Sequence, residues 1–343
     1  MSFESFASRI TIKPSVAPPP PDPSLHSLNR ARLSSALRAA GAPAGSLVLL
    51  AGGPSTTRHE TDHEPLFRQE SFFHWAFGVR EPDFMGVVSV DDGSATLFAP
   101  RLPPSYAVVM GRIKAPAEFA ALYGVERAAY VDELRGALAV GSGKLYLLRG
   151  RNTDSGATAA PAAVPPPAAG EPEALPLALD YDVLWPTITE LRVFKTPAEL
   201  AVLRYVGVVS SEAHIAVMQA TAQGMVEYQL ESLFHHWCQF HGGCRFLSYT
   251  CICASGVNSA VLHYGHAGEP NARTLAPGDM CLFDMGGEFA CYGADITTSF
   301  PVGGKFTPAQ RVIYDAVLAA VYAVEDSMKP GVPWLDMQTL AYR

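Results

Sequence analysis

The stretch Gly278-Asp279-Met280-Cys281-Leu282-Phe283-Asp284-Met285-Gly286-Gly287, continued by residues 288–300, decides how this chain is interpreted. Its two apolar segments predict two strands that fold back on each other through a glycine-rich corner. Each segment carries one carboxylate among hydrophobic neighbours, Asp284 in the first and Asp295 in the second. Both aspartates stand where a core side chain is expected.

Asp284 and Asp295 are expected to form a directly opposed cross-strand pair if the hairpin closes through an even-numbered loop. The Cβ atoms of such a pair lie about 4.5–5.5 Å apart. Two half-buried carboxylates at that separation repel, so one takes up a proton or a cation lies between them. A pair of divalent metal ions, bridged by the carboxylate oxygens, would resolve the conflict. The alternative is a slipped register, with one aspartate as a turn cap and the other in solvent.

The composition is that of a soluble globular protein with room for two domains. The chain has 343 residues, 48% of them hydrophobic, 17% charged, and a formal net charge of −8. The chain shows no basic stripe, so nucleic acid is not expected as a partner. It also shows no uninterrupted apolar run of about 20 residues, so no membrane partner is expected.

The six cysteines do not form a disulfide framework or a Cys-x-x-Cys pair. Cys251 and Cys253 lie two apart on one presumed strand and are interpreted as buried thiols, rather than as zinc ligands or a bridge. Reduced cysteines favour a cytoplasmic location. The N-terminal residues lack the apolar segment of a secretory signal, and an organellar address stays open.

The first part of the chain predicts a proline-rich tail and an α/β domain. The tail covers residues 1–23, the α/β domain residues 24–156, and an Ala/Pro-rich surface insert or linker residues 157–179. Helices are expected at 24–39, 116–123 and 131–139, and strands at 46–51, 72–77, 84–90, 95–98 and 145–148. His74, within the aromatic run 72–77, is interpreted as a hydrogen-bonded core histidine.

A second domain is expected over residues 180–343. Capping boxes at Thr196–Glu199 and Thr307–Gln310 open two helices, the first running to about residue 222 and the second to residue 329. Another helix is expected at 226–240 and a strand at 249–253. His214 is assigned to a helix face, not to a ligand set.

The remaining histidines divide into two groups. His235 and His236 are adjacent, so they point in different directions and are not expected to hold one ion together. His263 and His266 stand near a loop beside Asn258, Asn271 and Arg273, close to the prospective metal site. They are candidates for holding an anionic substrate or a tetrahedral intermediate, and the alternative is a pair of surface loop histidines.

Four segments closely resemble one known family. They are Arg68-Gln69-Glu70-Ser71-Phe72-Phe73-His74-Trp75-Ala76-Phe77-Gly78-Val79, Ser248-Tyr249-Thr250-Cys251-Ile252-Cys253, Ala260-Val261-Leu262-His263-Tyr264-Gly265-His266-Ala267-Gly268 and the stretch 278–287. The family is that of the eukaryotic prolidases, the cytosolic Xaa-Pro dipeptidases. The similarity covers nearly the whole chain except the tail and the insert.

The resemblance implies a smaller N-terminal α/β domain followed by an α+β metallopeptidase domain of the pita-bread fold. It implies two Mn²⁺ ions per complete subunit, a hydroxide bridging them, Xaa-Pro and Xaa-hydroxyproline dipeptides as substrates, and a homodimer. The family's two metal-binding aspartates fall on Asp284 and Asp295, and its substrate-binding histidine falls on His263.

The family's remaining ligands, a histidine and two glutamates, have no counterpart after Asp295. Only the first half of the pita-bread domain is therefore expected in these residues, with residues 334–343 as a helix cut off in progress. The expectation is a chain that is C-terminally truncated, inactive as it stands, and exposed on the apolar face that the missing half would cover. Two alternatives remain: an Xaa-Pro aminopeptidase of the same superfamily, and a non-catalytic pita-bread binding protein.

Overall fold

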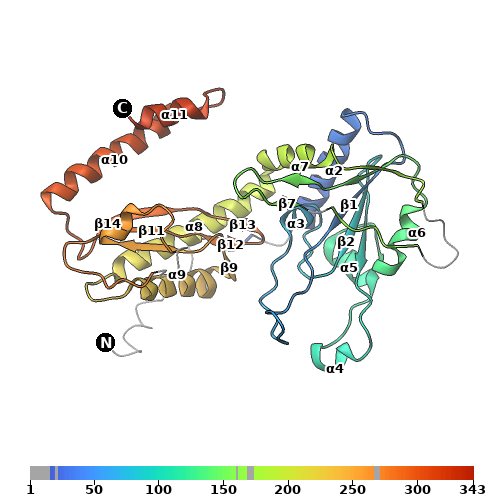
Figure 1. Ribbon diagram of the computed structural model, residues 1–343, viewed down its shortest axis with the longest axis horizontal. Coiled ribbons are helices and arrows are strands. Elements are labelled where there is room, and N and C mark those ends of the chain that lie inside the picture. The colour runs from blue at the N-terminus through green and yellow to red at the C-terminus, as the bar shows by residue number, and fades with distance from the viewer. Residues whose placement is uncertain (1–15, 20–21, 160, 168–173, 266–270) are drawn as a thin grey trace. The chain divides into compact units, whose positions relative to one another are not determined.

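The computed structural model describes residues 16–19, 22–159, 161–167, 174–265 and 271–343 (Figure 1). His266, most of the predicted tail and part of the predicted insert lie outside these residues. The described chain divides into two compact units, one over Pro20–Ala201 and one that includes Val202–Arg343. In the first unit, β8 (Ala178–Asp180) pairs with β5 (Lys144–Leu147). The division differs from the boundary at residue 180 expected from the sequence, because Leu184 and Ile188 of the following helix are buried in the core of the first unit.

The first unit is built on a six-stranded mixed sheet in the order β4-β3-β2-β1-β5-β8. Its other strands are β1 (Leu47–Ala51), β2 (Met85–Ser89), β3 (Ala95–Ala99) and β4 (Arg127–Tyr130), with a small hairpin of β6 (Gly150–Arg151) and β7 (Thr158–Ala159). Its helices are α2 (Pro23–Ala39), α3 (Ser71–Phe77), α4 (Tyr106–Met110), α5 (Pro116–Tyr123), α6 (Leu134–Leu138), which follows a 3-10 turn at Val131–Glu133, and α7 (Leu184–Val193).

Hydrophobic clusters cover both faces of this sheet, as an α/β arrangement requires. Val48 and Leu50 of β1 pack with α2, α3 and α7, whereas Leu49 between them packs with α6 on the other face. The predicted insert contributes Leu177, only 4% exposed, to the second cluster. Some of its residues therefore have apolar partners that its Ala/Pro composition does not reveal.

The expectation of a strand at residues 72–77 is wrong, because this segment is helix α3. The Glu70 carboxylate caps the helix by accepting hydrogen bonds from the amides of Phe72 and Phe73, and Gly78 ends it in a left-handed conformation. Residues Phe73–Phe77 are all buried, so no amphipathic period is visible in the sequence. His74 is among these buried residues, and burial lowers its pKa to about 3.

The second unit is built on a small antiparallel sheet in the order β10-β11-β14. Its strands are β10 (Ile252–Ser255), β11 (Met280–Asp284) and β14 (Thr297–Pro301), beside a second sheet of β13 (Tyr292–Gly293), β12 (Gly287–Phe289) and β9 (Phe246–Leu247). Its helices are α8 (Pro197–Ala220), α9 (Glu227–Gly242), α10 (Pro308–Ser327) and α11 (Trp334–Ala341), with a 3-10 turn at Gly256–Ala260. The strand expected at residues 249–253 therefore begins three residues later.

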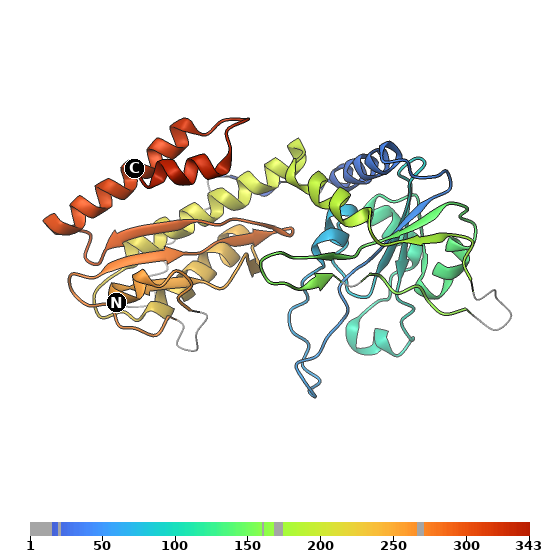
Figure 2. The same ribbon diagram turned by 45° about the horizontal axis from the view of Figure 1, so that its top comes forward.

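Helices α8 and α9 lie together on one side of this sheet, and α10 lies on the other (Figure 2). Val206, Val209 and Phe234 on the two helices pack against Phe283 and Met285 of the sheet segment. Among the described helices, α8 alone is long and apolar enough to span a membrane by length and composition. Its burial in this core accounts for that composition.

Both predicted capping boxes are present. In the first, the Thr196 amide donates to Glu199 Oε2 at 2.7 Å and the Glu199 amide to Thr196 Oγ1 at 3.3 Å. In the second, Thr307 and Gln310 exchange the same two bonds at 2.8 and 3.3 Å. These side chains satisfy amides that the first helical turn leaves without a partner, which fixes where α8 and α10 begin.

Candidate metal centre

One strand register runs through the whole aspartate segment and places its carboxylates. Asp284 lies opposite Thr297, the Met285 amide donates to the Ile296 carbonyl, and Phe289 lies opposite Tyr292. The chain reverses at Ala290 and Cys291, which both have positive φ, as a two-residue hairpin turn requires. The expectation of a glycine-rich corner is therefore wrong.

The direct opposition of the two aspartates is also corrected by this register. The partner of Asp284 is Thr297, two residues beyond Asp295, so the aspartates are diagonal neighbours. Asp295 falls opposite Gly286. A Cβ added at residue 286 would lie 1.8 Å from the Ala294 carbonyl oxygen, so the close approach of the two strands requires glycine there. Because strand side chains alternate between faces, residues 284 and 295 nevertheless remain on the same side.

Tyr249 joins the two carboxylates. Its hydroxyl contacts Asp284 Oδ1 in a short hydrogen bond and lies 3.1 Å from Asp295 Oδ1. Asp284 is half-buried and Asp295 is exposed, so the expectation that both are half-buried holds for the first alone. Burial, followed by the hydrogen bond to Asp284, raises the pKa of Tyr249, which keeps the phenol protonated as a donor.

Helix α8 fixes the backbone between the aspartates. His214 Nε2 lies 2.9 Å from the Met285 carbonyl oxygen, and its Nδ1 lies 3.1 Å from Thr298 Oγ1. One helical turn earlier, Ser210 Oγ accepts the Gly287 amide at 3.0 Å. Burial lowers the pKa of His214, which is 1% exposed. The assignment of His214 to a helix face rather than to a ligand set is consistent with these contacts.

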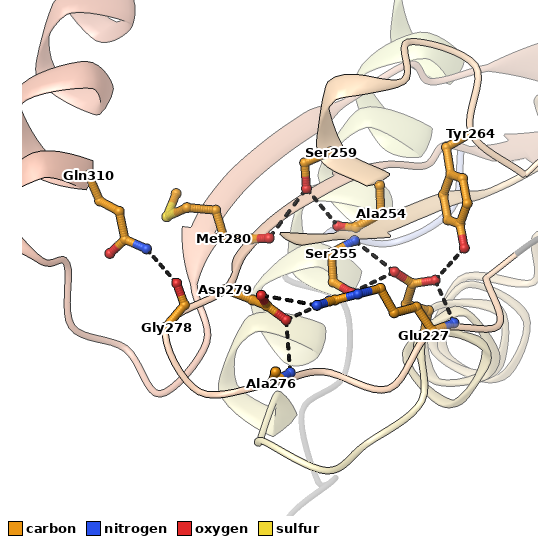
Figure 3. A network of polar contacts seen from close by, with 11 residues as sticks. Glu227, Ala254, Ser255, Ser259, Tyr264, Ala276, Gly278, Asp279, Met280 and Gln310 are labelled. Atoms are coloured by element: carbon orange, nitrogen blue, oxygen red, sulfur yellow. Dashed lines mark hydrogen bonds and ion pairs between the residues drawn. The ribbon is translucent and has the colours of Figure 1, made fainter. Parts of the chain in front are cut away.

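His263 lies exposed in the turn that follows the 3-10 segment Gly256–Ala260. Its neighbour Tyr264 donates a hydrogen bond of 2.7 Å to Glu227, a carboxylate with no exposed surface at the start of α9 (Figure 3). Glu227 also accepts the Ser255 amide and hydroxyl at 2.7 and 2.6 Å and the Arg273 amide at 3.0 Å. This network anchors the turn that carries His263 to β10 and α9.

An ion pair closes the same network on its other side. Arg273 contacts both carboxylate oxygens of Asp279, which holds the pKa of that carboxyl below its usual range. Asp279 also accepts the Ala276 amide at 2.8 Å and directly precedes β11 (Figure 3). The strand that carries Asp284 and the turn that carries His263 therefore share one set of polar supports.

Sequence reasoning missed Tyr249 and Glu227. Tyr249 lies within the Ser248–Cys253 segment that carries the resemblance, but nothing in its spacing from residue 284 indicates a contact. Glu227 looks like an ordinary acidic residue in a first helical turn, where carboxylates are common. Only its complete burial shows that it holds several backbone and side-chain donors.

The carboxylates fit a divalent-metal site in part. Two carboxylate groups that converge on one phenol oxygen are donors of the kind that Mn²⁺ or Mg²⁺ prefers. Asp284 and Asp295 together offer at most four oxygens, whereas each ion takes about four to six donors. A pair of ions would thus draw further donors from outside this aspartate pair.

Comparison with known proteins gives matches in both units. The family model of the aminopeptidase P N-terminal domain matches residues 26–145, and that of metallopeptidase family M24 matches residues 201–343. The chain is 54% identical over 321 residues to an Xaa-Pro dipeptidase of Pongo abelii, covering 93% of this chain and 64% of that protein. It is 32% identical over 315 residues to a probable Xaa-Pro aminopeptidase of Talaromyces stipitatus, covering 90% of this chain and 64% of that protein.

Solved structures give a consistent result for the fold. A histidine-to-alanine variant of Escherichia coli aminopeptidase P superimposes with a TM-score of 0.77 at 29% identity, over 94% of this chain and 72% of that one. Aminopeptidase PepP of Pseudomonas aeruginosa also gives 0.77, at 26% identity. These likenesses confirm the expected α/β domain and pita-bread domain. The chain spans 64% of the length of the curated dipeptidases that it matches.

Proposed function

Because residues 201–343 match metallopeptidase family M24, we propose that the chain carries the metal-binding aspartate pair of an Xaa-Pro dipeptidase. The observation that carries the proposal is the convergence of Asp284 and Asp295 on the Tyr249 hydroxyl. Identity to curated Xaa-Pro dipeptidases, at 52–54%, supports the substrate class. Substrates would be dipeptides with proline or hydroxyproline in second position.

Asp284 and Asp295 are proposed to hold two divalent ions, Mn²⁺ in the first instance. Such ions, when bound, lower the pKa of a shared water so that hydroxide is present near neutral pH. Tyr249 orients both carboxylates through its hydroxyl. His263 would bind the substrate from its exposed turn, and the Glu227 network would hold that turn in place.

The 343 residues alone are expected to be inactive. Two carboxylates cannot satisfy the coordination of two ions, so further donors must come from outside this aspartate pair. Turnover of Gly-Pro by a polypeptide of residues 1–343, at a rate comparable to a full-length relative, would refute this.

The test of the function is hydrolysis of Gly-Pro by a protein that contains these residues together with the further metal donors, purified without metal and supplied with Mn²⁺. Asp284→Asn and Asp295→Asn are each expected to lower kcat/KM by more than the roughly 10–100-fold that the loss of an orienting partner costs. Tyr249→Phe, which removes only such a partner, is expected to fall within that range. Full activity of both asparagine variants would contradict the assignment.

An Xaa-Pro aminopeptidase is the second candidate, and the similarity to solved aminopeptidase P structures favours it. The two activities differ in the length of the peptide they accept. Release of the first residue from Gly-Pro-Pro at a rate similar to Gly-Pro hydrolysis would support the aminopeptidase. Hydrolysis restricted to the dipeptide would support the dipeptidase.

We further propose a cytoplasmic homodimer. Reduced thiols are consistent with that compartment, and all six cysteines are free. Subcellular fractionation and the mass measured by light scattering test the two statements separately. A monomeric mass, or a location outside the cytoplasm, would leave the assignment of the metal site unchanged.

A further inference from the structure

A second cluster of metal-ligating side chains lies between helix α9 and the segment that leads into β10. Glu231, His235 and Cys251 each offer one ligand atom, and the three atoms lie within 4.8 Å of one another. Glu231 Oε1 and His235 Nε2 are 3.8 Å apart. Ligand atoms around a tetrahedral zinc ion are about 3.3–3.8 Å apart, so a small movement of these side chains would close the site.

The cluster is separate from the aspartate pair. Cys251 belongs to the hydrophobic cluster on the side of the sheet that α8 and α9 cover, together with Cys253, Phe283 and Met285. Asp284 alternates with Phe283 and Met285 along the strand and therefore points to the opposite side. The donor sets differ as well: the aspartates offer oxygen alone, whereas the cluster offers oxygen, nitrogen and sulfur.

Asn271 holds two members of the cluster in position. Its side-chain NH₂ group donates a hydrogen bond of 2.7 Å to Glu231 Oε2 and one of 3.1 Å to the Cys251 carbonyl oxygen. Its side-chain oxygen accepts a hydrogen bond of 2.9 Å from the Cys253 amide. Asn271 has no exposed surface. Glu231 thus keeps Oε1 directed toward His235, in the manner of a ligand oriented by an outer hydrogen bond.

Access also suits a metal ion. The His235 side chain is 50% exposed and that of Glu231 28%, whereas Cys251 is 1% exposed at the base of the cluster. An ion could enter past the histidine and reach the thiol. Burial raises the pKa of Cys251, so an ion must displace the thiol proton and its binding should strengthen as the pH rises.

From this geometry we propose that Glu231, His235 and Cys251 form a binding site for Zn²⁺ or a similar borderline divalent ion, with a water as fourth ligand. The mixed donor set selects zinc over manganese, which prefers oxygen. A bound ion ties α9 to the segment before β10. The site therefore stabilises the folded unit by an amount that rises with the logarithm of the free ion concentration once that concentration exceeds Kd.

His235 was not expected to be a ligand, because it is adjacent to His236. The two histidines do point in different directions, since His236 stacks on Phe240. The relevant spacing is that from Glu231 to His235, which are four residues apart on one helical face. Cys251 joins them only through the packing of the helix on the sheet.

The test is Co²⁺ and Zn²⁺ binding to the full chain carrying Asp284→Asn and Asp295→Asn, so that the aspartate pair cannot contribute. We expect one Co²⁺ per chain with a thiolate-to-cobalt charge-transfer absorption, displaced by Zn²⁺, and a Zn²⁺-dependent rise in Tm. Cys251→Ala should abolish the absorption, and His235→Ala should weaken binding at least tenfold. His236→Ala, the matched control on the same helix, should change nothing.

The absence of a charge-transfer absorption in the parent protein would overturn the proposal. So would equal Co²⁺ affinity of His235→Ala and His236→Ala. The His235 arm decides the matter if Cys251→Ala fails to fold, because His235 is largely exposed and its loss costs little stability. None of these readouts uses hydrolysis, so their outcome is independent of the proposed peptidase activity.

Discussion

The two faces of the sheet β10-β11-β14 differ sharply although consecutive residues of the same strands supply both. On the face that α8 and α9 cover, Cys281, Phe283 and Met285 have no exposed surface. On the other face, Leu282 and Asp284 are half-buried and Asp295 is exposed. A single strand thus serves as core on one side and presents a partly exposed carboxylate on the other.

Helix α10, which lies on that second side, has the same character. Ile313, Val317 and Val321 form a regular apolar stripe, yet they are 67%, 60% and 45% exposed. Together with Met280 and Ser299 they line a cavity of about 570 Å³. The sequence analysis expected an exposed apolar face in this unit, and this stripe agrees with that expectation.

The largest expected effect separates two adjacent residues of β11. Phe283→Ala should reduce the free energy of unfolding by about 3–5 kcal/mol, because it opens a cavity in a filled core. Leu282→Ala should cost roughly half as much or less, because the side chain is only partly removed from water. Urea denaturation of both variants measures the difference. Equal costs would mean that the two faces are packed alike.

The next effect tests how α8 supports the aspartate segment. His214→Ala should cost about 1–3 kcal/mol, because it leaves the buried Met285 carbonyl without its donor. His236→Ala, on the exposed side of α9, is the control and should cost little. A loss no larger than that of the control would show that α8 does not hold this segment through His214.

The lowered pKa of His214 predicts that the stability of this unit falls at acidic pH. Burial lowers the folded-state pKa of His214 below that of the unfolded chain, so the unfolded chain binds more protons once the pH falls below about 6.5. Stability should therefore fall with decreasing pH, and less steeply in His214→Ala. His26, His74 and His241 have lowered pKa values too and will supply the remaining slope. An unchanged slope in the variant would contradict the assignment.

On the other face, removing the charge of either aspartate should lower the proposed peptidase activity but hardly change the free energy of unfolding. Asp284→Asn and Asp295→Asn should change the free energy of unfolding by less than about 1 kcal/mol in metal-free buffer, because both side chains are in contact with water. Denaturation curves recorded beside the activity assay check this. A loss comparable to that of Phe283→Ala would make the aspartates structural rather than catalytic.

The smallest effect concerns the turn that sets the register of both faces. Cys291 has φ 62°, a left-handed conformation that glycine adopts without steric cost. Cys291→Gly should therefore raise the free energy of unfolding by about 0.5–1 kcal/mol. Cys291→Ser keeps the same constraint and should bring no gain. A destabilised glycine variant would show that the side chain makes a compensating contact.

Much of the fold was predictable, and the failures have physical causes. The capping boxes at Thr196 and Thr307 fixed helix starts because side-chain and backbone groups pair within four residues. Helix α3 was missed because all its residues from Phe73 to Phe77 are buried, which removes the periodic signal. The hairpin corner was misplaced because glycines attract a turn prediction, whereas Ala290 and Cys291 do not.

Part of the candidate site followed from residues 284 and 295 alone. Two acidic side chains in apolar strands are costly unless something compensates their charge, and that cost is visible in any sequence. Their diagonal placement was not predictable, since it depends on where the chain reverses. Tyr249 and Glu227 were missed because each acts across a long sequence separation.

The sequence by itself determined that this chain carries an α/β domain, a second domain with capped helices, and a pair of carboxylates on one side of a hairpin. These follow from local spacing and from the alternation of side chains along a strand. Only the tertiary structure decided that Tyr249 joins the carboxylates and that Cys251 meets Glu231 and His235. Such contacts arise when separate elements pack, and no local pattern in a sequence records them.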